Sequence, residues 1–260
     1  MRNLNVEVNR SVERAIQVLN AFGFEQSRLT IDDVVSKTGL PKTTVYRILW
    51  TLERNGLIHF DERYAHYRLS FKLLEYGGIV LQNLDVLREA EPFLLELQDK
   101  LDCTVILAER QGDTLQYLMR LESDDDFQPH SYVGRRRVLH YGIIGRTILA
   151  HLPASDVTRV VGQFPLEKST PETIVEEDAF YAQLREIKTH GYGIDVGGTF
   201  HGFTGIAVPL FGPTQKVIGA IGLAAPSYRF NSTEVLDRTV SLARQAADQI
   251  SRRMGYVNKD

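Results

Sequence analysis

The sequence predicts an α+β protein with an N-terminal winged helix-turn-helix, a linker helix and a larger C-terminal domain built on an antiparallel sheet. Three observations support this fold class. Helical spacing with clear cap signals runs from residue 11 to about residue 55, and a hairpin pattern follows it. Beyond residue 101, strand patterns and helix patterns come in separate groups, which favours helices packed on an antiparallel sheet. Finally, 43% of the residues are hydrophobic and 24% are charged, which is enough apolar material for a sizeable core.

Composition excludes several classes of protein. The chain carries a net charge of −3, but residues 1–75 alone hold 11 Lys and Arg against 9 Asp and Glu, a mild basic excess. Cys103 is the single cysteine, so neither an internal disulfide framework nor a cysteine-rich zinc site is expected. No apolar signal-peptide core and no run of about 18–20 apolar residues is present. These features predict a cytoplasmic protein that does not contact the membrane.

The first predicted helix covers residues 11–22, with Ser11 as its cap. Its apolar side chains recur at helical spacing and are expected to face the core. They are Val12, Ala15, Ile16, Leu19 and Phe22.

Two further helices follow around a tight turn. Thr30 is expected to cap a helix over residues 30–38, and Gly39 is expected to end it in the left-handed conformation. Pro41 suits the first turn of the third helix, which runs to about Asn55. This spacing is typical of a helix-turn-helix motif.

The third helix has two faces of different chemistry. On a helical wheel, Val45, Ile48, Leu49 and Leu52 lie on one side and are expected to pack against the first two helices. The opposite side is basic, polar and aromatic, as in a helix that reads the major groove of DNA. Its members are Thr43, Arg47, Trp50 and Arg54, with Tyr46 at the edge.

These outward residues predict a DNA-binding surface. Lys42, Thr43 and Thr44 lie near the helix start, where side chains and the helix N-terminus favour phosphate. Arg47 is long enough to reach a guanine edge, and Tyr46 can contact a thymine methyl group or a phosphate. A simple solvated helix face is the alternative. The adjoining hairpin and the capped three-helix core favour DNA.

A hairpin is predicted from Leu57–Phe60 and Tyr67–Leu69, which flank a polar tip. Arg63, His66 and Arg68 would be wing residues that contact the DNA backbone or the minor groove. Ordinary polarity of an exposed hairpin explains them equally well. No base-reading role is assigned to Trp50.

A linker helix is expected over about residues 71–83, followed by a second helix with Pro92 near its start. An acidic loop is expected at Asp124-Asp125-Asp126. Strands are predicted at residues 103–110, 114–122, 192–196, 205–211 and 216–226, and helices at residues 143–152, 174–191 and 231–255.

Motifs along nearly the whole chain resemble those of the IclR family of bacterial transcription regulators. The segment "SVERAIQVLNAF" is similar to the family's opening helix, and "GLPKTTVYRILWTLERNGLI" resembles its recognition helix. "YRLSFKLLEYG" resembles the entry to its linker, and "GRRRVLHYGIIGRTILAHLP" and "HGYGIDVGGTFHGFTGIAVPLF" resemble two effector-domain motifs. These motifs occur in the family's order over more than 200 residues.

The resemblance implies a winged helix-turn-helix domain over residues 1–70, a linker helix over residues 71–84 and a GAF-like effector-binding and oligomerisation domain over residues 85–257. It also implies dimers, often paired into tetramers, on palindromic or repeated operators in double-stranded DNA. A small-molecule effector would then control operator affinity or the recruitment of RNA polymerase. The regulated genes are expected to form a catabolic operon.

The family's effector-pocket motifs fall, position by position, on Tyr141, Gly142, Ile143, Ile144, Asp195, Gly205, Gly222 and Ala224. Gly205 stands where the family has cysteine, and Gly222 and Ala224 stand where it has serines. Smaller side chains at these three positions are expected to leave room. We therefore expect a larger and less uniformly polar effector than a short oxo-acid, such as an aromatic catabolite or a sugar derivative. Its anchors would be Asp195, His201 or Thr204. Close-packed strand positions without any ligand are the alternative.

No catalytic residue, metal site or cofactor motif is expected. The histidines are scattered without metal-ligand spacing, and Cys103 begins a predicted strand, where a buried structural thiol is expected. The segment "GIDVGGTFHG" resembles a phosphate-binding loop of sugar kinases, but it lies late in the chain and follows a helix. A sugar- or nucleotide-binding enzyme domain, or an oligomerisation module without ligand, remains as the alternative.

Overall fold

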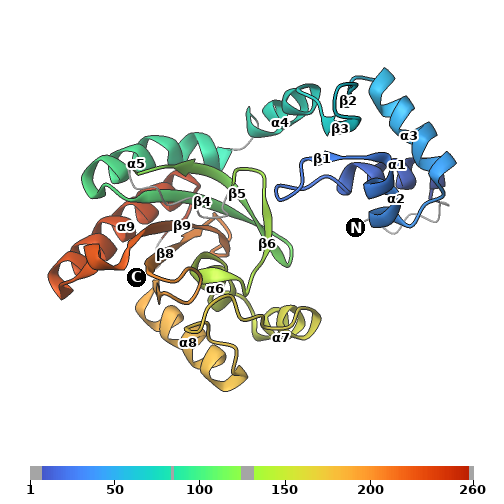
Figure 1. The fold of residues 1–260 in the computed structure, drawn as a ribbon. Coiled ribbons are helices and arrows are strands. Elements are labelled where there is room, and N and C mark those ends of the chain that lie inside the picture. The colour runs from blue at the N-terminus through green and yellow to red at the C-terminus, as the bar shows by residue number, and fades with distance from the viewer. Residues whose placement is uncertain (1–7, 83–84, 124–131, 258–260) are drawn as a thin grey trace. The chain divides into compact units, whose positions relative to one another are not determined.

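The computed structural model describes residues 8–82, 85–123 and 132–257. The chain divides into two compact units, Met1–Asn83 and Leu84–Asp260 (Figure 1). Along the first unit lie α1 (Arg10–Asn20), β1 (Arg28–Leu29), α2 (Ile31–Thr38), α3 (Lys42–Arg54), β2 (Ile58–Asp61), β3 (His66–Leu69) and α4 (Lys72–Gln82).

The first unit is a three-helix core with a small antiparallel sheet in the order β1-β3-β2. Thr30 caps α2 in a capping box with Asp33, and Gly39 ends that helix at a φ of 67°. These are the predicted boundaries. Pro41 precedes α3 as its N-cap, one residue before the expected position in the first turn. The predicted hairpin is confirmed as β2 and β3.

The expectations for α1 are partly wrong. Asn9, not Ser11, caps the helix, because the Asn9 side chain accepts hydrogen bonds from two backbone amides. Val12 and Ile16 are 54% and 51% exposed, whereas Val18 is fully buried. The helix carries two adjoining apolar stripes of equal spacing, and periodicity does not decide which one meets the core.

Along the second unit lie α5 (Asp85–Leu101), β4 (Thr104–Gln111), β5 (Thr114–Leu121), β6 (Arg136–Val138), α6 (Gly142–Ala150), α7 (Ala154–Gln163), α8 (Glu177–His190), β7 (Gly193–Val196), β8 (Phe203–Phe211), β9 (Val217–Pro226), the 3-10 turn η1 (Ser227–Phe230) and α9 (Thr233–Arg253). The six strands form one antiparallel sheet in the order β6-β5-β4-β9-β8-β7. The expected α+β architecture is confirmed.

Each face of this sheet carries its own hydrophobic core. Helices α5 and α9 cover one face, and α6 and α8 cover the other (Figure 1). Alternate residues of β4 separate the faces, since Val105 and Leu107 belong to the first core and Ile106 and Ala108 to the second. The closing helix α9 therefore packs on its own sheet through residues such as Ala243 and Ile250.

Several local predictions for the second unit need correction. Pro92 lies inside α5, seven residues after its start at Asp85, and not near the helix start. Pro92 faces solvent, where water can bind the carbonyl that loses its intrahelical partner. The sequence patterns also missed β6 and α7, and the acidic loop Asp124-Asp125-Asp126 lies outside the described residues.

The described helices include none with the length and apolar composition to span a bilayer. In the same residues, no cluster of three or more His, Cys, Asp or Glu side chains has the arrangement of a metal site.

Cys103 is expected to be unreactive in the native chain. It is 3% exposed, and burial raises the pKa of its thiol to about 12, so almost no nucleophilic thiolate is present at neutral pH. Ellman's reagent should therefore label the native chain very slowly and the guanidinium-unfolded chain with one equivalent. Rapid labelling of native protein would contradict this placement.

Candidate functional site

Helix α3 presents the predicted polar face to solvent. Val45 and Leu49 are fully buried against the rest of the first unit, and Leu52 is 7% exposed. Lys42, Thr43, Tyr46 and Arg47 are exposed on the opposite side, and Thr44 is half-buried. The buried stripe thus fixes which residues of α3 face outward.

The cations on this face differ in their partners. Lys42 Nζ lies 2.6 Å from Asp32 Oδ1, in an exposed ion pair that contributes little to stability and that an anion can displace. Within the described residues Arg47 forms no ion pair, so its guanidinium is free for a ligand. Trp50, which is 51% exposed, lies under the Arg54 guanidinium at 4.8 Å from the ring centre, in the same helix.

The small sheet adds a basic row that the sequence did not reveal. Arg68 of β3 is paired with Arg28 of β1 on one side and with His59 of β2 on the other. Directly opposite residues project to the same face of a sheet, so these three exposed side chains adjoin. Strand β1 has only two residues and no alternation, which is why Arg28 was missed.

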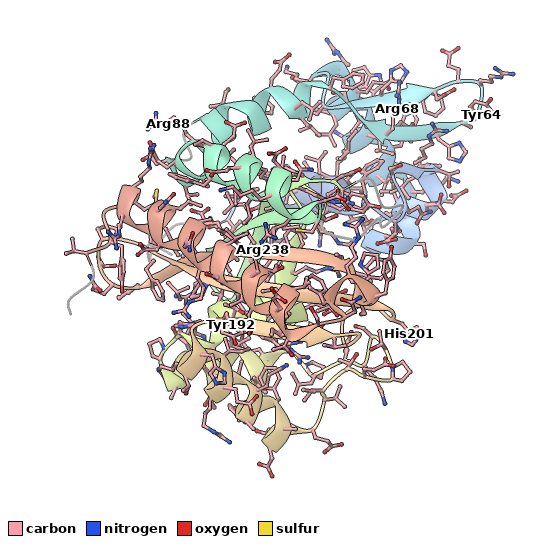
Figure 2. All side chains as sticks on the ribbon, turned by 90° about the vertical axis from the view of Figure 1, so that its left-hand side faces the viewer. Tyr64, Arg68, Arg88, Tyr192, His201 and Arg238 are labelled. Atoms are coloured by element: carbon pink, nitrogen blue, oxygen red, sulfur yellow. The ribbon has the colours of Figure 1, made fainter. Side chains whose placement is uncertain are left out.

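Arg63 lies in the hairpin tip beside Tyr64, which Figure 2 labels, and His66 begins β3. Arg63 is exposed and its guanidinium lies 5.3 Å from the ring centre of Tyr64. His66 is half-buried, and its Nδ1 atom is shielded from solvent. Arg63 and Arg68 are therefore accessible to a ligand, and His66 is much less so.

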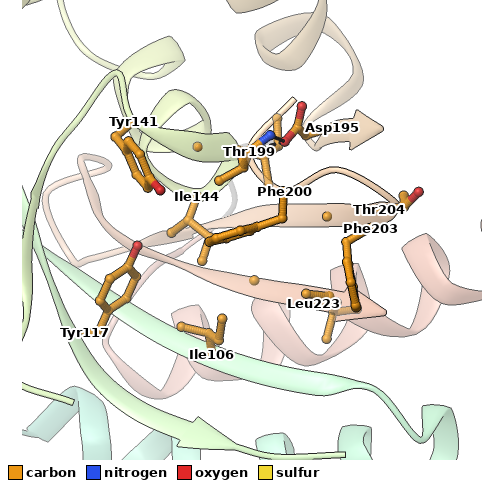
Figure 3. A pocket seen from close by; sticks show the side chains of 15 residues that line it. Ile106, Tyr117, Tyr141, Ile144, Asp195, Thr199, Phe200, Phe203, Thr204 and Leu223 are labelled. Carbon is orange, nitrogen blue, oxygen red and sulfur yellow. Dashed lines mark hydrogen bonds between the residues drawn. The ribbon is translucent and has the colours of Figure 1, made fainter. Parts of the chain in front are cut away.

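The second unit contains a cavity of about 70 Å³ between the sheet and the start of α6 (Figure 3). It brings together nine of the ten predicted effector residues. These are Tyr141, Gly142, Ile143, Ile144, Asp195, Thr204, Gly205, Gly222 and Ala224.

His201 does not line this cavity. Its side chain is 78% exposed and lies at the edge of the molecule, with Nδ1 3.3 Å from Glu172 Oε1 (Figure 2). It follows the turn after β7, which directs it away from the sheet.

Six lining residues were not predicted. Phe200 lies in the turn after β7, and Phe203 is the first residue of β8. Tyr117 of β5 points into the cavity (Figure 3). Burial raises the pKa of the Tyr117 phenol, so the phenol stays protonated and can donate a hydrogen bond. The six are Ile106, Tyr117, Thr199, Phe200, Phe203 and Leu223. The sequence indicated the strands that carry Ile106 and Tyr117, but not which strands lie beside them in the sheet.

The first residues of α6 form one wall of the cavity. Gly142 begins the helix at a φ of 63°, a conformation that L side chains rarely adopt. Gly145 lets the helix approach the preceding backbone, since a Cβ there would lie 2.4 Å from the Leu139 carbonyl oxygen. The helix start is thus held close to the backbone that precedes it.

The expectation that Gly205 and Gly222 leave room is wrong. A Cβ on Gly222 would lie 2.3 Å from Ile144 Cδ1, and a Cβ on Gly205 would lie 3.1 Å from Ile143 Cγ2. The two isoleucines of α6 fill the space that the smaller strand residues vacate. A dry cavity of about 150 Å³ holds benzene, so the cavity of about 70 Å³ admits a ring only after a side chain moves.

Asp195 holds the turn that closes the cavity. Its Oδ2 atom accepts hydrogen bonds from the Thr199 amide at 2.8 Å and from the Thr199 hydroxyl at 2.6 Å. A Cβ on Gly198 would lie 2.2 Å from Asp195 Oδ1, so the turn needs glycine there. The glycine-rich segment that resembles a kinase loop is thus a turn after β7, folded around this carboxylate.

Comparison with known proteins agrees with the sequence motifs. The model of the IclR helix-turn-helix domain matches residues 11–62, and that of the bacterial transcriptional regulator IclR C-terminal domain matches residues 78–252. The HTH-type transcriptional regulator KdgR of Escherichia coli (strain K12) is 30% identical over 257 residues, and the match covers 97% of each chain. KipR of Bacillus subtilis (strain 168) is also 30% identical, over 96% of this chain and 98% of its own.

Solved structures have the same fold over nearly the whole chain. An IclR regulator from Alicyclobacillus acidocaldarius superposes with a TM-score of 0.84 at 25% identity, covering 96% of this chain and 100% of the other. An IclR homologue from Microbacterium hydrocarbonoxydans, solved in complex with 4-hydroxybenzoate, superposes with a TM-score of 0.80 at 25% identity, covering 94% and 98%. The family consists of transcription regulators and not enzymes, and its members work in the bacterial cytoplasm. The chain belongs to the IclR family of bacterial transcription regulators, with a DNA-binding helix-turn-helix domain and a C-terminal effector-binding domain.

Proposed function

We propose that α3 enters the major groove of operator DNA and contacts it through Lys42, Thr43, Thr44, Tyr46 and Arg47. The observation that carries this proposal is the exposed basic and hydroxyl-bearing face of α3, on the second helix of a tight helix pair. Arg63 and Arg68 of the hairpin contact the flanking backbone or minor groove.

The wing can be tested separately from the recognition helix. Arg28→Ala and Arg68→Ala are each expected to weaken DNA binding about equally for all sequences and to lower the slope of log affinity against log salt by about 1, because each removes a phosphate contact. Fluorescence anisotropy over a salt series measures both quantities. Arg238→Ala, an exposed arginine of α9, is the matched control and should leave the slope unchanged. An unchanged slope for both sheet variants would remove Arg28 and Arg68 from the interface.

The cavity beside α6 is the proposed effector site. Its walls are largely apolar, with Ile106, Phe200 and Leu223 among them, which supports an effector with an uncharged body. Entry of such a body displaces Ile143 or Ile144. Binding in this way couples the effector to the position of α6, and so to operator affinity or RNA polymerase recruitment. A catabolic operon is the proposed target.

We further propose that the protein works as a homodimer or as a dimer of dimers. Helix α4 exposes Leu74, Tyr76 and Ile79 at 68%, 51% and 59%, and none of residues 72–79 is buried. An apolar helix of this kind gains by packing on a second copy. Sedimentation analysis of the full chain is expected to show a dimer or tetramer, and a monomer at micromolar concentration would contradict it.

The regulator function is tested by selecting binding sites from random DNA with the full chain and then adding candidate effectors. Repeated or palindromic half-sites are expected. A thermal-shift screen should find compounds larger than oxo-acids that raise the melting temperature and change operator affinity. If only glyoxylate-sized acids act, the proposed ligand class is wrong. If no compound acts, the C-terminal domain is an oligomerisation module.

A further inference from the structure

A second cavity, of about 330 Å³, adjoins the effector cavity and shares Tyr141, Gly142 and Thr199 with it. Its lining is mixed, with apolar residues such as Phe164 and Leu166, but it holds far more charged side chains than that of the first cavity. It contains the side chains of Arg136, Arg137, His140 and Arg146, and one carboxylate, that of Glu167. The shared residues make the two cavities neighbouring compartments around the start of α6.

Arg146 is a buried charge held by neutral groups. Its side chain is 7% exposed. The guanidinium donates to the His140 carbonyl at 3.1 Å, to Gln183 Oε1 at 2.6 Å and to the Ile174 carbonyl at 3.2 Å. No carboxylate of the described residues lies within 4.0 Å of it, although buried cations in proteins are usually paired. These three bonds use three of its five N–H groups, which leaves two for a ligand.

Two further polar atoms in this cavity have no hydrogen-bond partner among the described residues. His140 is 7% exposed, and its Nε2 atom is buried and unpartnered. Arg137 Nε is likewise buried and unpartnered, while its guanidinium lies 4.4 Å from the ring centre of Tyr141. Buried polar atoms are nearly always hydrogen-bonded in native proteins, so a ligand group is expected between them.

The start of α6 adds to the positive field. The helix begins at Gly142, which lines both cavities, and Tyr141 provides no side-chain cap. An uncapped helix N-terminus favours an anion. Burial lowers the pKa of the Arg146 guanidinium, and the charge of Asp195 partly offsets this effect. Asp195 also weakens the positive field, although its Oδ2 atom already accepts two hydrogen bonds from Thr199.

We propose that this second cavity is the oxyanion compartment of the effector site. A carboxylate or phosphate group binds beside Arg146, Arg137 and His140, and the uncharged body of the same molecule reaches past Tyr141 into the apolar cavity. The inference rests on the proposed effector function and names its ligand class, a small organic anion. It also explains how an anion can be held although Gly205, Gly222 and Ala224 carry no hydrogen-bonding side chain.

Calorimetric titration of the full chain at constant ionic strength tests the compartment. Inorganic phosphate, acetate and benzoate are the anionic probes, and benzamide is the uncharged counterpart of benzoate. We expect measurable binding of phosphate or acetate, the tighter of which identifies the preferred group, and about tenfold weaker binding of benzamide than of benzoate.

Arg146→Gln and Arg137→Gln are each expected to weaken anion binding about tenfold or more, because each removes a charge-assisted hydrogen bond. Arg137 is half-buried and tolerates replacement if Arg146→Gln fails to fold. Arg185→Gln, an exposed arginine of α8, lowers the net charge equally and should bind as the unaltered chain does.

The outcomes separate the two proposals. If the anions fail to bind, or bind all variants equally, the oxyanion compartment is disproved, while neutral effectors can still act through the apolar cavity. If anion binding is lost in both arginine variants but no bound anion changes operator affinity, the compartment stands and the proposed effector function fails.

Discussion

Replacement of Ile144 by alanine is expected to lower the free energy of unfolding by about 2–4 kcal/mol, as for other large-to-small changes in a core. Ile144 is 9% exposed, and its Cδ1 atom occupies the space above Gly222. The loss combines the transfer free energy of three carbon atoms with the cavity that they leave. Guanidinium unfolding followed by circular dichroism measures it.

The same variant is expected to gain affinity for a ring-sized probe such as benzoate, because the removed side chain enlarges the effector cavity. Ile148→Ala is the matched control, since Ile148 is fully buried in the same helix but does not line the cavity. It should lose similar stability and gain no affinity. Equal benzoate affinity for both variants would place the effector elsewhere.

Gly222 completes this test. In the unaltered chain, Gly222→Ala forces Ile144 to move, because the new Cβ would lie 2.3 Å from Ile144 Cδ1. In the Ile144→Ala background the same substitution has free space and is expected to cost less. A double-mutant cycle measures this coupling, and additive free energies would show that the two residues do not compete for the same space.

Arg47→Ala is expected to weaken operator binding by about 1–3 kcal/mol, roughly 5- to 150-fold, if the guanidinium reads a base. The reason is the exposed position of Arg47 on the outer face of α3, without an ion pair in the described residues. The variant should also lose preference at one position of the selected site. Anisotropy titrations with the selected operator and with single-base variants measure both effects.

Arg238→Ala is again the control, since Arg238 is exposed but lies on α9 of the second unit. It is expected to leave both the affinity and the site preference unchanged. If Arg47→Ala retains both the affinity and the site preference of the unaltered chain, the recognition helix is wrongly assigned.

The helix-turn-helix could be predicted from the sequence because the residues that determine it are close together along the chain. The capping box at Thr30, the left-handed Gly39 and the buried stripe through Val45 and Leu49 all depend on residues within one or two helical turns. Such signals fix where a helix begins and which face it buries. Where two apolar stripes competed, as on α1, local spacing failed, because contact with other helices chose between them.

The cavity residues were found by family motifs, but their arrangement was not. The sequence showed three small residues at Gly205, Gly222 and Ala224, and interpreting the two glycines as open space was wrong. Side chains of α6 fill that space, and their positions depend on how the helix lies on the sheet. Small side chains in one strand do not indicate which side chains of a neighbouring element pack against them.

By itself the sequence determined the fold class, the outward face of α3 and most residues of the effector cavity. Only the tertiary structure decided that Arg28 adjoins Arg68, that Ile144 covers Gly222 and that Arg146 is buried with no carboxylate of the described residues within 4.0 Å. The physical reason is distance along the chain. Caps and periodicity act between near neighbours, whereas strand pairing, packing and the partners of a buried charge join residues that no local pattern relates.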